Sequence, residues 1–159
     1  HLAAELFKSM AGVNLTHVPY KGGGPAVTSL VGGETVVGFA TAPSVIQQIK
    51  SGRLRGLAVT TLKRTAAAPE LPTIAESGVA NYDANTWYGA LAPAKTAPAV
   101  ITRLHAEFVR IMRAPEILER IAVLGYEAST TTPQEFGAYI KSEVAKWGKV
   151  VKAAGIRAD

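Results

Sequence analysis

The sequence contains no cysteine, which excludes disulfide bonds, thiol catalysis and cysteine-ligated metal sites. Charged residues form only 18% of the 159 residues, and no apolar run approaches the ~20 residues that a bilayer-spanning helix needs. Lysine and arginine outnumber the acids by 17 to 12, but they are scattered rather than gathered into a basic stripe, so no nucleic-acid partner is expected. With 48% hydrophobic residues, the composition predicts one folded core or two small lobes rather than a disordered chain.

The chain opens on His1, with neither an initiating methionine nor a signal segment. Targeting segments are removed from mature proteins, so their absence does not define a compartment. We therefore expect a mature or excised piece of a longer protein.

Hydrophobic periodicity predicts helices that alternate, in the first half, with β-branched runs. The expected helices cover residues 2–10, 25–31, 43–50, 98–113, 115–124 and 133–154. The expected strands cover residues 14–18, 35–39, 54–60 and 86–91. Helices between strands at this spacing predict βαβ units on a parallel sheet, and a polar stretch at 81–85 predicts a boundary between residues 1–82 and residues 83–159.

A glycine-rich turn joins the first expected strand to the next helix. Its residues are Tyr20, Lys21, Gly22, Gly23, Gly24, Pro25 and Ala26. A proline at the first helical position after three glycines predicts a tight turn that aims the free N–H groups of a helix N-terminus into a concavity. Free donors and the positive end of the helix dipole suit an anion, and glycine lets a ligand approach the backbone. The alternative is that the glycines only make a sharp turn.

A second strand-to-helix junction follows the strand that ends at residue 39. Its residues are Thr41, Ala42, Pro43 and Ser44. In a doubly wound sheet both junctions open at the carboxyl ends of the strands, where such sheets collect ligands. Two helix N-termini with the hydroxyls of Thr41 and Ser44 nearby would hold a small carboxylate. The alternative is that Pro43 and Ser44 only start a helix.

No catalytic, nucleotide or metal motif is present. The glycine turn lacks the Gly-Lys-Ser/Thr of a phosphate loop, and the sixth position counted from Gly22 is Val27, unlike a dinucleotide fingerprint. There is no Gly-x-Ser-x-Gly elbow, and no pair of acids forms a general acid/base couple. His1 and Glu5 share a helix face without the spacing of a metal site, and His17 is interpreted as a structural residue of a strand. We expect no cofactor, no metal and no enzymatic activity.

Several motifs together resemble the periplasmic solute receptors of tripartite tricarboxylate transporters, known as the Bug family. They read HVPYKGGGPAVTSLVGGE, IKSGRLRGLAVT, LPTIAESG, WYGALAPAKTAP and KWGKVVKAAGI, in this order and over almost the whole chain. The resemblance implies a type II periplasmic-binding fold, with two α/β lobes that close by a hinge on a small carboxylate. The loop that matches residues 20–26 helps to clasp the carboxylate in this family. The membrane subunits of the transporter are the implied partners.

The resemblance also implies a specific division of the chain. Residues 1–82 would form most of the second lobe, and residues 83–159 the C-terminal part of the first. The family's leading strand and its proline-glycine-glycine loop are not present, so we expect the C-terminal part of a monomeric receptor whose exposed sheet edge makes this piece self-associate. Ligands of the family include di- and tricarboxylates, acidic amino acids and aromatic acids. Many relatives carry an aspartate where this chain has Ala40, which favours a ligand without an amine.

Two other functions share such a scaffold, because fold does not determine function. One is an effector or sensor domain, which a DNA-binding segment upstream would favour. The other is a small α/β enzyme, which the missing catalytic constellation argues against. A signal peptide upstream would favour the receptor.

Overall fold

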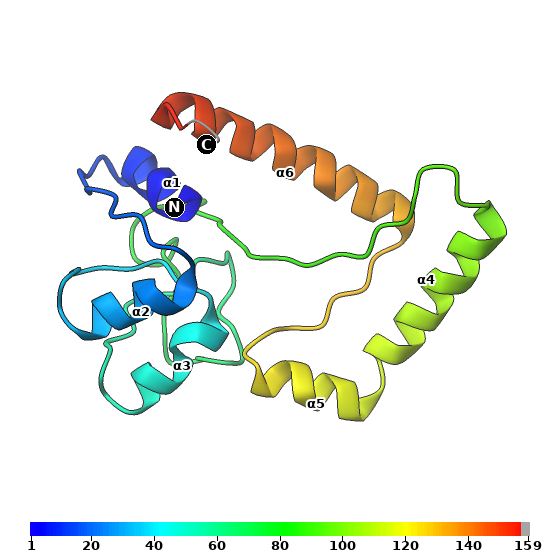
Figure 1. Ribbon diagram of the computed structural model, residues 1–159, viewed down its shortest axis with the longest axis horizontal. Helices are drawn as coiled ribbons and strands as arrows, with labels where there is room; N and C mark the ends of the chain where they lie inside the picture. The colour runs from blue at the N-terminus through cyan, green and yellow to red at the C-terminus, as the bar shows by residue number, and fades with distance from the viewer. Residues whose placement is uncertain (157–159) are drawn as a thin grey trace.

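The computed structural model describes residues 1–156, which contain six α-helices in two sequential groups (Figure 1). The first group consists of α1 (Leu2–Ala11), α2 (Gly23–Val31) and α3 (Ala42–Lys50). The second consists of α4 (Pro98–Met112), α5 (Pro115–Val123) and α6 (Pro133–Ala154). The helices lie where hydrophobic periodicity predicted them.

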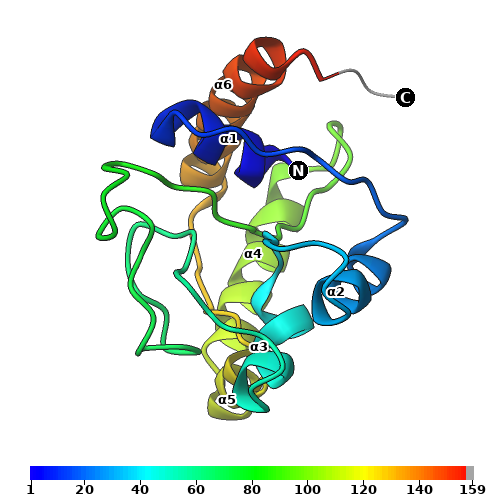
Figure 2. The same cartoon turned by 90° about the vertical axis from the view of Figure 1, so that its left-hand side faces the viewer.

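In the second group, α4 lies apart from the first group, and α6 runs back to it. One extended connection, residues 84–92, leads from the first group to α4, and a second, residues 126–132, joins α5 to α6 (Figure 1). The long α6 then runs back over α1, and Figure 2 shows the two helices crossing at close range. Helix α6 therefore belongs to the C-terminal group by sequence but contacts the N-terminal group in space.

The ends of α6 follow the predicted capping chemistry. The Glu135 backbone N–H donates to Thr132 Oγ1 at 3.2 Å, and the Thr132 N–H donates to Glu135 Oε2 at 2.8 Å, which completes a capping box. These bonds from the Thr132 backbone and hydroxyl hold the pKa of Glu135 below its ordinary value. Gly155 ends the helix at φ 63°, a left-handed conformation that favours glycine. Both predicted ends of this helix are confirmed.

The expected start of α2 at Pro25 is wrong by two residues, because the helix begins at Gly23. Pro25 therefore occupies the third helical position rather than the first. That position is tolerated because the first backbone N–H groups of a helix have no partner in the preceding turn, so a proline there forfeits no helical bond.

Of the predicted sheet, residues 1–156 contain one isolated parallel bridge, between Val59 and Thr73. The Val59 N–H donates to Pro72 O at 2.8 Å and the Ile74 N–H to Val59 O at 3.0 Å. The other expected strands are not formed: Thr35 and Val36 lie in a bend, and residues 35–40 and 85–92 form no backbone–backbone hydrogen bonds. Extended conformation is a local preference, whereas a sheet also needs neighbouring strands, and these segments do not supply them to one another.

The core lies where α1, α6 and residues 74–84 meet. Tyr82 is fully buried in a cluster with Ile74 and Ala84, and its hydroxyl donates to Ala3 O of α1 at 2.8 Å. Burial and the nearby charge of Asp83 raise the pKa of Tyr82 to about 12. The predicted lobe boundary at residues 81–85 therefore begins inside the core rather than in a solvated linker.

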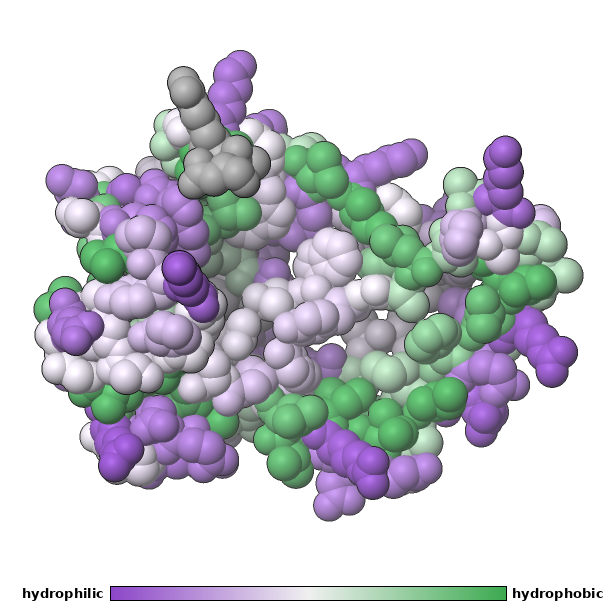
Figure 3. Space-filling view, viewed as in Figure 1, coloured by the Kyte–Doolittle hydropathy of each residue, from purple (hydrophilic) through white to green (hydrophobic). Residues whose placement is uncertain are grey.

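The apolar face of α4 is largely exposed in this chain. Its exposed members are Val100, Leu104, Phe108 and Ile111. Further apolar side chains, among them Tyr88 and Leu91 of the extended connection and Leu118 of α5, are also exposed. Figure 3 shows apolar side chains at the surface of this half of the molecule. The periodicity correctly marks the apolar stripe, but no element within residues 1–156 packs on it.

Candidate functional site

The glycine turn presents two free backbone donors at the start of α2. Gly22, the N-cap, has φ 106° and ψ 175°, a conformation that is open almost only to glycine. Its N–H donates to Tyr20 O at 2.9 Å, but no side chain caps the helix. Pro25 has no N–H, so the first turn leaves the N–H groups of Gly23 and Gly24 without an acceptor among residues 1–156. These groups and the helix dipole make the turn attractive to an anion.

The space beside these donors is open. A Cβ built on Gly23 or Gly24 would meet no atom within 4 Å, and neither glycine has a positive φ. The fold of this chain therefore requires glycine at Gly22 but at neither of the next two positions. Because the fold does not require glycine at these two positions, the missing side chains leave room for a ligand to approach the backbone.

Tyr20 and Lys21 have different roles in this turn. The Tyr20 hydroxyl shares a hydrogen bond of 2.5 Å with the hydroxyl of Ser29, which is buried in α2. This bond ties the start of the turn to the helix that follows it. Lys21 is exposed and forms no ion pair within the described part of the chain. Its ammonium group is thus free to attract an anion.

The start of α3 satisfies more of its own polar groups than expected. Thr41 is the N-cap, and Pro43 lies in the first turn as predicted. The Ser44 hydroxyl donates to Thr41 O at 2.7 Å, the Thr41 hydroxyl donates to Ser44 Oγ at 3.3 Å, and the Ser44 N–H also donates to Thr41 O. Both hydroxyl hydrogens predicted to face the ligand are therefore engaged locally, and the Ala42 N–H is a backbone donor of this turn without an acceptor among residues 1–156.

Helices α2 and α3 pack side by side, with their N-terminal ends toward the middle of the molecule in Figure 1. Gly38 in the connecting segment allows this packing, because a Cβ there would lie 2.9 Å from Leu30 Cδ2. The structure thus brings both predicted junctions to the same region. Two cavities described here, of about 810 Å³ between α1 and α6 and about 270 Å³ beside α3, are not lined by either helix start.

A segment from the C-terminal half reaches the start of α3, which sequence reasoning missed. A Cβ built on Gly125 would lie 3.2 Å from Ala42 Cβ, so the connection after α5 crosses the first turn of α3. The next residue, Tyr126, shares a hydroxyl hydrogen bond of 3.2 Å with Tyr88 of the other extended connection. This bond raises the pKa of Tyr126 above its ordinary value. Gly125 was interpreted only as the end of a helix, and no local signal marks its contact with Ala42.

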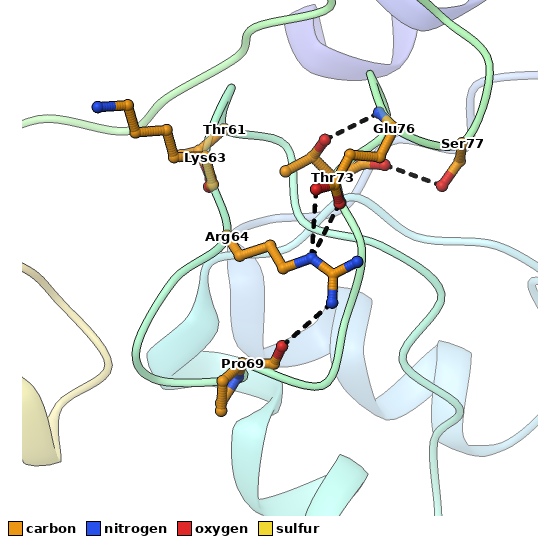
Figure 4. A network of polar contacts seen from close by, with 7 residues as sticks. All are labelled: Thr61, Lys63, Arg64, Pro69, Thr73, Glu76 and Ser77. Atoms are coloured by element: carbon orange, nitrogen blue, oxygen red, sulfur yellow. Dashed lines mark hydrogen bonds and ion pairs between the residues drawn. The ribbon is translucent and has the colours of Figure 1, made fainter.

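An exposed polar network holds the loop between the first and second groups of helices (Figure 4). Arg64 Nε donates to Glu76 Oε2 at 3.0 Å, and the Thr73 N–H donates to the same oxygen at 2.8 Å. The bond from the Thr73 backbone, aided by the Arg64 guanidinium, lowers the pKa of Glu76. Both partners of the Glu76 carboxylate lie on its own loop, so these bonds stabilise the loop.

The histidines do not form a metal site. His1 Nε2 lies 3.7 Å from Glu5 Oε1, as their shared helix face predicted. His17 is exposed, lies in no strand and stacks on the His1 ring at 3.8 Å between centroids, so the strand in its interpretation is wrong. Over residues 1–156, no three histidine or acidic side chains gather as metal ligands would. Within the same range, no helix is both long and apolar enough to cross a bilayer.

Comparison with known proteins adds information about the whole chain. A family model described as "Tripartite tricarboxylate transporter family receptor" matches residues 1–156. Protein BugT of Bordetella pertussis is 33% identical over 157 residues, which cover 99% of this chain and 48% of BugT. The solved structure of R. palustris Rpa4515 with adipate matches with a TM-score of 0.86 at 36% identity, over 98% of this chain and 52% of that one.

A second solved structure, the periplasmic binding protein BugD, has a TM-score of 0.77 at 32% identity and covers 100% of this chain and 54% of its own. The chain therefore spans about half the length of each of these proteins. The superpositions confirm the predicted α/β fold of the type II periplasmic-binding kind, although the strand segments are mostly unpaired here. The predicted division at residue 82 stays a prediction, and residues 157–159 of its second part lie outside the described residues.

Proposed function

Because the chain belongs to the receptor family of tripartite tricarboxylate transporters, we propose that it forms part of an extracytoplasmic receptor that binds a small carboxylate. Rpa4515, with which it shares 36% identity, was solved with adipate, a dicarboxylate. Family and structural neighbours are binding proteins, and the proposed role is likewise binding without catalysis. The proposed location is the periplasm, and the proposed partners are the membrane subunits of the transporter.

The observation that carries this proposal is the first turn of α2. Gly23 and Gly24 each offer a backbone N–H without an acceptor, in open space, at the positive end of a nine-residue helix. A carboxylate oxygen accepts such donors in bonds that are roughly twice as strong as those between neutral groups. We expect one carboxylate of the ligand at this turn, with the Ala42 N–H of α3 as an additional donor.

The chemistry of the turn also limits the ligand. No acidic side chain lies in residues 20–26 or 39–44, so nothing in either junction would pair with an ammonium group. The ligand class proposed is therefore a dicarboxylate or tricarboxylate without an amine. Succinate and aspartate provide a matched test, because they differ only in that group.

The direct test is a thermal-shift measurement on the complete receptor with adipate, succinate, citrate and aspartate. A ligand at a hundred times its dissociation constant raises the free energy of unfolding by about 2.7 kcal/mol, which gives a clear shift. We expect stabilisation by one or more of the amine-free acids and none by adipamide, which has adipate's length without its charges. Equal stabilisation by adipate and adipamide, or by none of the acids, would contradict the proposal.

A further inference from the structure

A buried carboxylate on α6 lies at the contact between the two halves of the chain. Glu143 is only 6% exposed. Its Oε2 accepts hydrogen bonds from the indole N–H of Trp147 at 2.9 Å and of Trp87 at 3.4 Å, and its Oε1 pairs with Lys146 Nζ at 2.5 Å. Burial raises the pKa of Glu143, but the donors Lys146, Trp147 and Trp87 outweigh it and leave that pKa below its ordinary value.

The two indoles that share Oε2 are anchored in different parts of the fold. Trp147 packs against the core cluster around Tyr82, which belongs to the N-terminal half. Trp87 lies on the extended connection that leads into the C-terminal half. One oxygen atom thus joins the core of the first half to the chain that leaves it.

The extended connection is seated closely on α6 at this point. The Trp87 ring meets Phe136 edge-on at 5.6 Å and Tyr139 at 5.4 Å between centroids. Two residues on, on the same side of an extended chain, Gly89 lies so close that a Cβ would be 2.1 Å from Phe136 Cζ. Backbone hydrogen bonds do not hold residues 85–92, so these side-chain contacts determine their position.

The charged and titratable groups around the carboxylate are few. Lys146 is its ion-pair partner, and the charges of Glu143 and Asp83 both contribute to a raised pKa of Tyr139, for which burial is the main cause. A glutamine in place of Glu143 would have one acceptor oxygen, and its NH₂ group would face either an indole N–H or the Lys146 ammonium. The carboxylate is therefore the group that suits three converging donors.

We propose that Glu143 is the positioning residue of the joint between the two halves, and that its shared oxygen sets how freely residues 85–91 move relative to α6. The inference rests on the proposed function for its consequence: in a receptor that closes on its ligand, the stiffness of this connection governs the balance between open and closed forms. Glu143 itself lies outside the proposed carboxylate site.

Glu143 and Lys146 have the i,i+3 spacing of an ordinary ion pair on a helix surface. The proposed role of Glu143 depends instead on its bonds to the two indoles. Glu107 and Arg110 form such a pair on α4, at 2.8 Å and in solvent. If the ion pair alone mattered, Lys146→Gln would reproduce Glu143→Gln. If the indole bonds matter, Trp87→Phe, which keeps a ring but removes the N–H, would reproduce it instead.

NMR backbone relaxation of the complete receptor without ligand tests the joint, because it reports mobility in a segment whose amides form no backbone hydrogen bonds. We expect Glu143→Gln and Trp87→Phe to lower the order parameters of residues 85–91 from the rigid range of about 0.85 toward about 0.6, because both variants weaken the bonds between the indoles and the carboxylate. Lys146→Gln should have a smaller effect, and the matched control Glu107→Gln none. Equal order parameters in Glu143→Gln and Glu107→Gln would overturn the inference. If Glu143→Gln fails to fold, Trp87→Phe decides.

Small-angle scattering with and without adipate tests the consequence for closure. We expect Trp87→Phe to change the compaction that adipate induces, with a change in its affinity of threefold or more. Lower order parameters with unchanged compaction and affinity would overturn the link to closure. If the unmodified receptor binds no carboxylate, the proposed function fails, but the relaxation result still decides the role of Glu143 in the joint.

Discussion

The proposed carboxylate site leads to a specific prediction: filling the open space beside its backbone N–H groups should weaken binding more than removing a positive charge. We consider Gly23→Val and Lys21→Ala in the complete receptor. A Cβ at Gly23 meets no atom within 4 Å and the residue has no positive φ, so the fold accommodates the Cβ of a valine. The valine does place a branched side chain beside the two free N–H groups of the first turn.

The expected magnitudes differ by more than tenfold. Hydrogen bonds to a charged group are worth about 1.5–3 kcal/mol each, so the loss of two weakens binding by about 3 kcal/mol or more. This corresponds to an affinity at least about 100-fold lower, since 1.4 kcal/mol is a factor of ten. Lys21 is exposed, so its charge contributes less than about 1 kcal/mol, and Lys21→Ala should weaken binding by no more than about fivefold.

Isothermal titration calorimetry with adipate measures both variants, and thermal unfolding checks that each is folded. Gly148→Val is the matched control, because Gly148 on α6 also has open space around its Cβ and lies away from the site. We expect this variant to bind like the unmodified receptor. A larger loss of affinity in Lys21→Ala than in Gly23→Val would refute the backbone site and favour a simple charge interaction.

Three further predictions concern contacts within and between the two halves. Gly89→Ala should lower the free energy of unfolding in urea by about 1–3 kcal/mol, because its Cβ would lie 2.1 Å from Phe136 Cζ. Adding Phe136→Leu should recover part of this loss. If the losses of stability in the two single variants simply add in the double variant, the clash is refuted. Tyr82→Phe should cost about 1 kcal/mol, or a melting temperature lower by about 2–4 °C, since it loses the bond to Ala3 O; an unchanged melting temperature would contradict it. The pKa of Glu143 is lowered in the fold, so its contribution to stability is present above the ordinary glutamate pKa of about 4.3 and is lost as the pH falls through its lower folded-state pKa. The stability difference between the unmodified protein and Glu143→Gln should therefore shrink in acid, and a constant difference would contradict this sign.

The candidate site was predictable as far as it depends on neighbouring residues. The turn from Tyr20 to Ala26 carries its own signals: glycines that admit unusual backbone angles and a proline that suits the first turn of a helix, where no backbone donor is needed. The exact first residue was not predictable, because Gly23 and Pro25 are both acceptable early in a helix. The engaged hydroxyls of Thr41 and Ser44 were missed because residues that suit a ligand also suit a local cap.

The identity of the ligand and the self-association of this chain stay predictions. The exposed apolar face of α4 and the unpaired segment 85–92 are the surfaces that would associate or be covered in a longer receptor. Analytical ultracentrifugation of the 159-residue chain measures this directly.

The sequence by itself determined the family, the positions of the helices and their ends to within about two residues, because caps, glycine stops and apolar periodicity act over a few residues. The capping box of Thr132 and Glu135 and the left-handed Gly155 needed no distant partner. Only the tertiary structure decided which distant residues meet. Gly125 at the start of α3, and Trp87 with Trp147 on one oxygen of Glu143, are separated by tens of residues in the chain. Such contacts depend on how α6 returns across the first half, and no local pattern encodes that path. The same is true of strand pairing, which requires neighbours as well as an extended chain.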